Sequence, residues 1–433
     1  MEDHQPQHFH NPHRGSGGER GRGRGGGRGR GGGGQRGFGG RGRGGRGNYN
    51  SNNYSPNNNN NNDLSNSTQF YLHPVQYAKA LEDPWAILEH DYEAYLAQLE
   101  LVAVIVVKPG DASQLHIQET ETPVPASSQL LVKVHSFGLN RMDIVQRNGA
   151  YPAPFGAPQN ILGVEFAGTI AQIGGEESES SWNVGDRVFG LVYGGAYAEF
   201  VVVDKEIAIR IPDHISFALE ASLPEVWFTA LQALRLNCDL KEGENVLIHA
   251  GASGVGSAAV QLAKAFGAKN VIVTVGSEDK KKYCKELGAT HAFNYKTEDW
   301  PKEVDKVTGG KGVDAIVDFV GQTHWDGNLA SLALDGRMVM LAFLSGPVIK
   351  ESNIGAILRK RLTIRGSTLR SRELPYTRDL KRQVEQYVFI PLFTNASPFR
   401  SVIDKEFSWK DIQEAHRYLE SNASMGKIVV NID

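Results

Sequence analysis

Apolar and polar residues alternate along this chain in patterns that change near residues 100 and 223. After Leu101, short strand-like runs such as 102–107 are separated by Gly, Pro and Asp, which predicts a β-rich part. Between about 223 and 364, strand-like runs alternate with helical ones, and this spacing predicts a parallel, doubly wound sheet. The pattern of residues 407–433 predicts one helix followed by one strand. The chain therefore predicts an α/β fold in which a β-rich part precedes a doubly wound one.

Residues 14–62 lack the apolar content of the rest of the chain. Residues 14–47 are nearly all Gly and Arg, and residues 48–62 are mostly Asn. Such segments bury too little apolar surface to offset the ordering of their backbone, so we expect a disordered arm over 1–68. Over 69–100, apolar side chains recur at helical spacing after the Asp83-Pro pair. This predicts a helical linker that packs on the core, with a docking or partner-binding helix as the alternative.

Charge is distributed unevenly along the chain. Residues 1–47 hold ten Arg, no Lys and three acids, about +7, so the remainder carries about −10 of the total charge of −3. A basic tail on an acidic body is typical of segments that contact nucleic acid. Arg spaced by Gly, with Phe38, Tyr49 and Tyr54 nearby, is typical of arms that bind single strands through charge and stacking. We expect the arm to bind single-stranded RNA; the alternative is a solvated tail with no partner.

Cysteine is sparse, which bears on the compartment. Cys238 and Cys284 are the only two, and this argues for a reducing compartment and against a disulfide framework or a multi-cysteine zinc lobe. The N-terminus has no apolar signal-peptide core, and the longest aliphatic run, 101–107, is far shorter than the roughly 20 residues of a spanning helix. We expect a soluble protein with no membrane partner, cytoplasmic and compatible with a nuclear location.

The strongest local motif is the stretch 245–256, NVLIHAGASGVG, which runs into the helical pattern 257–266. An apolar strand, a Gly-rich turn and a helix in direct succession predict a dinucleotide site, with the pyrophosphate at the positive end of the helix. One glycine permits the turn, a second lets backbone approach the phosphates and a third lets the helix pack on the strand, while a serine replaces the ideal second glycine of the fingerprint. The cofactor-contacting residues predicted here are Gly251, Ser253, Gly254, Val255 and Gly256.

The end of the next strand indicates which dinucleotide binds. NAD-binding folds usually place an acid there to accept the ribose 2′-hydroxyl. This chain instead has Gly276 and Ser277, followed by Lys280, which leave room, a hydroxyl donor and a positive charge for a 2′-phosphate. Glu278 and Asp279 oppose this interpretation, and Lys280 could also be a solvated surface charge. The pattern favours NADPH as the cofactor.

Several further motifs carry a family resemblance. They are 139–151 (LNRMDIVQRNGAY), 160–168 (NILGVEFAG), 249–256, 293–296 (FNYK) and 369–372 (LRSR). From about residue 101 onward the chain resembles the zeta-crystallin-type quinone oxidoreductases, zinc-free medium-chain dehydrogenases/reductases, in particular the p53-inducible branch. The resemblance implies a GroES-like catalytic domain over 101–224, a Rossmann domain over 225–370 and a segment, 371–433, that returns to the first domain.

The resemblance also locates the positions that hold catalytic zinc in the related alcohol dehydrogenases. They are Asn140, Val164 and Glu225 here, whereas such a zinc needs three good ligands and an open position. His135 and His249 are isolated and are expected to be packed or surface histidines. We therefore expect no metal, and an acceptor that is already electrophilic, such as a quinone or an enone.

The resemblance implies roles for further residues. Tyr151 would position the acceptor and could donate a proton, Asn140 would hydrogen-bond the acceptor oxygen, and Thr229 would touch the nicotinamide ring. Tyr295 would lie near the adenosine phosphate. Four residues match cofactor-contacting segments at the far side of the cleft: Phe343, Ser367, Leu369 and Arg370.

Relatives form homodimers through strand edges, here expected at 339–342 and 362–365, and zeta-crystallin relatives are known for binding RNA as well as nucleotide. Two other functions remain open. One is an enoyl-thioester or 2-alkenal reductase on the same scaffold, and the other is an RNA-binding protein that uses the reductase fold as a dimeric platform.

Overall fold

The computed structural model describes residues 100–433 except 177–179, 211, 213 and 395–396, all within one compact unit, Leu72–Asp433. The predicted arm (1–68) lies outside the described residues, as does the predicted linker (69–100) apart from Glu100, which begins the first strand. None of the helices within the described ranges combines the length and apolarity that a membrane crossing requires.

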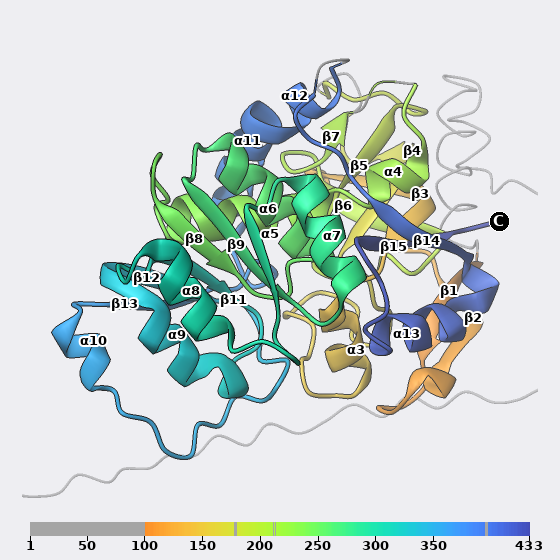
Figure 1. Cartoon of the computed structure of the whole chain (residues 1–433). Helices are drawn as coiled ribbons and strands as arrows, with labels where there is room; N and C mark the ends of the chain where they lie inside the picture. Colours follow the sequence, from red (N-terminus) through yellow and green to blue (C-terminus); the bar gives the residue numbers. More distant parts are fainter. Residues whose placement is uncertain (1–99, 177–179, 211, 213, 395–396) are drawn as a thin grey trace, which may run out of the picture. The chain divides into compact units, whose positions relative to one another are not determined.

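The β-rich part contains a hairpin and a seven-strand sheet (Figure 1). The hairpin pairs β1 and β2 in antiparallel fashion across a short 3-10 turn, η1. The sheet has the order β14-β15-β3-β4-β5-β7, and β6 also pairs with β3. Its elements and those packed beside it are β1 (Glu100–Val106), η1 (Ala112–Gln114), β2 (Leu115–Glu121), β3 (Gln129–Gly138), α3 (Arg141–Arg147), β4 (Glu165–Ile173), β5 (Arg187–Leu191), β6 (Phe200–Asp204), β7 (Ile209–Arg210), α4 (Phe217–Ala221), β14 (Ile403–Ser408), η6 (Trp409–Asp411), α13 (Ile412–Glu420) and β15 (Lys427–Asn431).

The second sheet has six parallel strands in the order β10-β9-β8-β11-β12-β13. This is the strand order of a dinucleotide-binding Rossmann fold, in which the order reverses between β8 and β11 and ligands bind outside the carboxyl ends of those strands. Its elements are α5 (Pro224–Leu231), η3 (a π-helical turn, Gln232–Asn237), β8 (Asn245–Ile248), α6 (Gly254–Ala265), β9 (Asn270–Val275), α7 (Glu278–Leu287), β10 (His291–Asn294), α8 (Trp300–Thr308), β11 (Val313–Asp318), η4 (Gln322–His324), α9 (Trp325–Ser331), β12 (Leu332–Met340), α10 (Gly355–Arg359) and β13 (Thr363–Gly366).

The central strands of this sheet are apolar because both of their faces are covered. In β8, Val246 and Ile248 pack into one core with α5 and α6, while Leu247 between them packs into another with Trp300 and Val304 of α8. Successive side chains of a strand point to opposite faces, so a continuous apolar run satisfies both layers. This confirms the doubly wound α/β fold expected from the sequence.

The chain returns to the first sheet at its C-terminal end. Strand β15 pairs antiparallel with β3, where Val429 faces Gly138, and parallel with β14 (Figure 1). Before that return come α11 (Leu374–Val384), η5 (Glu385–Phe389) and α12 (Ile390–Leu392). Leu380 and Val384 of α11 share a buried cluster with the Rossmann strands. The limits 101–224, 225–370 and 371–433 remain a proposal, with the return itself beginning at β14.

The strand order corrects one expectation about subunit contacts. Strand β12 is hydrogen-bonded on both sides, to β11 and to β13, so residues 339–340 at its end have no free edge. Of the two expected segments, only 362–365 reaches an edge strand, because 363–365 belong to β13, which forms one edge of the sheet, while β10 forms the opposite edge. A periodic sequence pattern predicts strands but does not show which of them is outermost.

Candidate active site

The Gly-rich turn lies between the end of β8 and the start of α6, at the switch point of the sheet. Ser253 is the N-cap of α6, and its hydroxyl accepts a hydrogen bond from the N–H of Gly256 at 3.1 Å. This cap explains the serine that replaces the fingerprint glycine, because an N-cap hydroxyl satisfies a helix donor that would otherwise lack a partner. The residue with left-handed backbone is Ala250, at φ +49°, rather than one of the glycines.

The glycines of the turn are required by close packing. A Cβ at Gly251 would lie 2.7 Å from Cβ of Val273, and one at Gly256 would lie 2.3 Å from the carbonyl oxygen of Ala250. A Cβ at Gly254 would lie 2.9 Å from the side chain of Lys427. The turn therefore lies directly against the neighbouring strand β9 and against β15.

This turn fits the pyrophosphate of a dinucleotide. The N–H groups of Gly254 and Val255 lie in the first turn of α6, where a helix offers no internal partner for its donors. They begin a helix of 12 residues, whose dipole favours an anion at this end. A donor-rich helix start at the switch point is the arrangement that dinucleotide-binding folds use.

The end of β9 forms a second part of the cleft. Ser277 caps α7, and its hydroxyl oxygen accepts from the N–H of Lys280 at 3.4 Å, so its hydroxyl proton remains available. A Cβ at Gly276 would lie 3.1 Å from the hydroxyl of Tyr295, so Gly276 and Tyr295 adjoin. Glu278, which argued against a phosphate here, pairs with Lys281 at 3.2 Å. Four predicted residues, Gly276, Ser277, Lys280 and Tyr295, thus lie at neighbouring strand ends.

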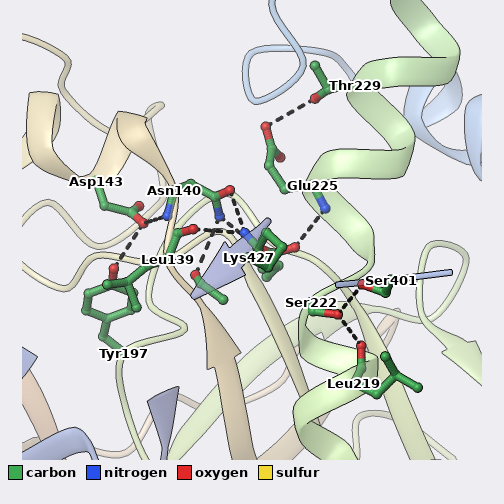
Figure 2. Close-up of polar contacts among 12 residues, drawn as sticks. Leu139, Asn140, Asp143, Tyr197, Leu219, Ser222, Glu225, Thr229, Ser401 and Lys427 are labelled. Carbon is green, nitrogen blue, oxygen red and sulfur yellow. Dashed lines mark hydrogen bonds and ion pairs between the residues drawn. The ribbon is translucent and has the colours of Figure 1, made fainter. Parts of the chain in front are cut away.

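Asn140, Val164 and Glu225 are the positions that the resemblance matches to zinc ligands, and Figure 2 shows the surroundings of Asn140 and Glu225. Asn140 follows β3 and begins α3, with its N–H donated to the carboxylate of Asp143 at 2.7 Å. Its side-chain amide donates to Oε1 of Glu165 at 2.8 Å, and Oε2 of Glu165 accepts from the N–H of Glu225 at 2.8 Å. Val164 supplies no donor atom. No group of three or more potential metal ligands occurs within the described ranges, and this trio does not fit a zinc ion.

A buried lysine takes the central place in this cluster. Nζ of Lys427, on β15, donates to Oε1 of Glu165 at 2.5 Å, to Oδ1 of Asn140 at 2.9 Å and to the carbonyl of Leu139 at 2.8 Å (Figure 2). Lys427 is 4% exposed and Glu165 is fully buried. Because all three lysine donors are used, the ion pair is also a complete hydrogen-bonding unit, and it fixes the orientation of the Asn140 amide.

The carboxyl of Glu225 is shifted toward its protonated form. Burial, reinforced by the neighbouring charge of Glu165, raises the pKa of Glu225 to about 8. Its Oε1 accepts from the hydroxyl of Thr229 at 3.3 Å, one helical turn further along α5 (Figure 2). Burial also raises the pKa of Asp143 to about 6, against the hydrogen bond from Tyr197. The site therefore holds a carboxylic acid with a proton to donate.

Tyr151 and Arg370 lie together on another side of the site. The guanidinium of Arg370 is 5.8 Å from the centre of the Tyr151 ring. Arg370 donates to the carbonyl of Tyr193 and to Oε1 of Gln146, and its buried Nη2 has no partner among the described residues. Burial raises the pKa of Tyr151, and the charge of Arg370 opposes this effect. Tyr151 is thus a protonated phenol beside a cationic guanidinium.

The remaining predicted residues are less closely gathered. Ser367 accepts from the amide of Asn237, Leu369 packs in the core, and Phe343 is half exposed beside Gly321. His249 is a packed histidine, bonded through its two ring nitrogens to Thr274 and Asn328. His135 stacks on Phe217.

Sequence reasoning missed the pair formed by Glu165 and Lys427, and it treated Glu225 only as a lost zinc ligand. A signal was present, because each member of the pair is a lone charge within an apolar strand pattern. Buried charges of that kind need a partner.

Comparison with known proteins places this architecture. Residues 126–213 match the family of alcohol dehydrogenase GroES-like domains, and residues 254–383 match the family described as zinc-binding dehydrogenases. These matches, with the two sheets, define a medium-chain dehydrogenase/reductase. The quinone oxidoreductase of Salmonella typhimurium is 33% identical over 323 residues, 74% of this chain and 96% of that protein. The chain belongs to the zeta-crystallin/quinone oxidoreductase family.

Solved structures agree with this assignment. The NADPH complex of Escherichia coli quinone oxidoreductase has a TM-score of 0.68 and 29% identity, with 77% of this chain and 99% of that chain covered. The CurK enoyl reductase also has a TM-score of 0.68, with 27% identity and coverage of 77% and 100%. The fold and the oxidoreductase class are therefore shared by quinone reductases and enoyl reductases alike.

Proposed function

We propose that this protein reduces quinones or related electrophilic acceptors with NADPH and without zinc. The observation that carries the proposal is the cluster of Lys427, Glu165 and Asn140, which takes the place of a metal site. Without a zinc ion to stabilise an alkoxide, the site suits an acceptor that is electrophilic on its own. The similar quinone oxidoreductases and the NADPH complex of one of them support the acceptor class and the cofactor.

The cofactor would be held by the two strand ends. The N–H groups of Gly254 and Val255 would bind the pyrophosphate, and Gly276, Ser277, Lys280 and Tyr295 would surround the 2′-phosphate. When bound, NADPH supplies the hydride. Thr229 on α5 and the segment with Phe343, Ser367 and Leu369 would border the nicotinamide.

The residues of this chain manage the proton and the orientation of the acceptor. Reduction of a quinone carbonyl leaves an oxygen that needs a proton. Glu225 would donate it because burial raises its pKa to about 8, and Tyr151 would donate it because a phenol keeps its proton near neutral pH. Arg370 would direct its free Nη2 to an acceptor oxygen. The second amide hydrogen of Asn140 makes only a 3.5 Å contact with the carbonyl of Gly138. Because this contact is long, that hydrogen would be able to bind the acceptor instead.

An acceptor panel tests this proposal and its main competitor. Purified protein is given NADPH with benzoquinones, naphthoquinones, 2-alkenals and enoyl-thioesters, and kcat/KM is compared. We expect quinones to exceed the others by at least tenfold. A preference for enoyl-thioesters would instead support an enoyl reductase, the activity named for the similar CurK structure.

Two partners accompany the proposal. The Arg/Gly-rich arm would bind single-stranded RNA through phosphate neutralisation and stacking, although it lies outside the described residues. A homodimer would form along the free edge of β13. Leu334 on β12, and Ile354 and Leu358 in the segment that precedes β13, are each more than half exposed, and exposed apolar residues are common at protein interfaces.

A further inference from the structure

Three cations gather beside the end of β9. Lys280 lies on α7, Lys296 follows β10, with its Cε 3.4 Å from where a Cβ of Gly276 would be, and Arg141 is the first residue of α3. Burial lowers the pKa of Lys280, the charges of Lys296 and Arg141 act in the same direction, and the charge of Asp404 opposes them. None of the three makes an ion pair with a carboxylate among the described residues.

Two of these cations meet at one residue of the loop before β15. Nη2 of Arg141 donates to Oδ1 of Asn422 at 2.6 Å, and Nζ of Lys280 donates to the backbone carbonyl of Asn422 at 2.7 Å. Asn422 has a left-handed backbone, φ +56°. Its side-chain oxygen and its backbone carbonyl oxygen each accept one of these two hydrogen bonds. Arg141 belongs to the β-rich part and Lys280 to the Rossmann part, so the loop joins cations from both.

The nearest acids have other partners. Asp404 accepts from the hydroxyl of Tyr418 at 2.7 Å, and Glu420 pairs with Arg147. Like charges that are partly buried repel one another unless an anion joins them. The cluster lies next to the N-terminus of α7, a helix of ten residues whose dipole also favours an anion.

We propose that Arg141 is a second ligand of the adenosine 2′-phosphate, so that this phosphate joins α3 to α7 across the cleft. This inference rests on the proposed function, because it assumes that the cofactor is NADPH. On binding, the guanidinium exchanges its bond to Asn422 for phosphate oxygens, which a planar guanidinium binds in bidentate fashion. Selection of the phosphate is then shared between the two parts of the chain.

A structural role is the competing explanation. Arg141 also donates to the carbonyl of Leu419 at 3.1 Å, in the last turn of α13. In the competing explanation, Arg141 caps this helix end and has no other role. A cap would contribute equally whichever nucleotide is bound. The two explanations therefore differ in the dependence on phosphate.

The test is calorimetric titration of wild-type protein and of the Arg141→Gln, Arg141→Lys and Lys280→Glu variants. Arg417→Gln is the matched control, because it removes an exposed arginine of α13 that pairs only loosely with Glu414. The probes are NADPH, NADH, adenosine 2′,5′-bisphosphate and adenosine 5′-monophosphate. Melting without nucleotide verifies that each variant is folded.

We expect Arg141→Gln to weaken NADPH and the bisphosphate about tenfold, equal to about 1.4 kcal/mol, and to leave NADH and the monophosphate unchanged. Arg141→Lys should recover part of the loss, Lys280→Glu should lose at least as much, and Arg417→Gln should lose nothing. The role of Arg141 would be overturned if Arg141→Gln weakened the probes with and without a 2′-phosphate equally, or weakened none of them. The proposed cofactor would still stand in that case if wild-type protein preferred NADPH. A wild-type protein that binds NADH and NADPH equally would overturn both this inference and the proposed cofactor.

Discussion

Replacing Lys427 with Met would remove the cation of the buried pair and leave the carboxylate of Glu165 without its charge partner. The methionine chain fills most of the lysine volume, so the change is chiefly electrostatic. Glu165 would keep the donors from the Asn140 amide and the N–H of Glu225. Asn140 would lose the bond that orients its Oδ1.

The magnitude follows from the burial of both groups. Breaking a buried ion pair by removing one partner costs about 3–5 kcal/mol, because a buried charge is left uncompensated. A folded part of about 330 residues has an unfolding entropy near 0.7 kcal/mol per degree, so this loss lowers Tm by about 4–7 °C. Removing both charges in Lys427→Met/Glu165→Gln should recover most of the loss, since no unpaired charge remains.

The assay is urea unfolding and thermal melting of the two variants beside wild type, with Lys410→Met as control. Lys410 is exposed and pairs at 3.5 Å with Asp433, so its loss should change stability by less than about 0.5 kcal/mol. If Lys427→Met is as stable as wild type, or if the double variant is less stable than the single one, the pair is not an electrostatic unit and our reasoning is wrong.

Three other outcomes are expected. The raised pKa of Glu225 means that the folded state holds a proton that the unfolded state releases. The contribution of this proton to stability is complete below about pH 4.5 and is lost as pH rises through about 8. Glu225→Gln should remove this dependence of the unfolding free energy on pH, measured by urea unfolding at pH 5 and 8, and an unchanged dependence would contradict the assignment. NADPH turnover should survive exhaustive chelation, and a stoichiometric zinc whose removal abolishes turnover would refute metal independence. Deleting residues 1–62 should abolish most RNA binding and leave NADPH turnover unchanged. For the full-length protein, the logarithm of RNA affinity should fall with the logarithm of salt concentration with a slope near −3.5, for about five phosphate contacts. RNA affinity that survives the deletion would exclude the arm as the RNA-binding element.

Local patterns in the sequence were sufficient to predict the strand, the Gly-rich turn and the helix of residues 245–266. A buried strand, a Gly-rich turn and a helix are adjacent in the chain, so the stretch 245–256 could be interpreted without knowledge of the rest of the fold. Even there, the packing details required the structure. The left-handed residue is Ala250, and Ser253 is a helix cap.

The parts that were not predicted depend on contacts between distant residues. Lys427 and Glu165 are 262 positions apart, and each alone is only a charged residue in a strand. Arg141 and Lys280 meet at Asn422 for the same kind of reason. Which strand has the free edge also depends on tertiary pairing, so the expectation for 339–342 was wrong and that for 362–365 stays a prediction.

The most direct test of the central claim is NADPH oxidation by a quinone in zinc-free protein. Absorbance at 340 nm follows NADPH, and hydroquinone is quantified in the same anaerobic sample after chelation. We expect one hydroquinone for each NADPH oxidised, with saturation in both substrates and at least tenfold lower kcat/KM for NADH. Protein that binds no NADPH, or oxidises it only after zinc is restored, would contradict a zinc-free NADPH-dependent quinone reductase.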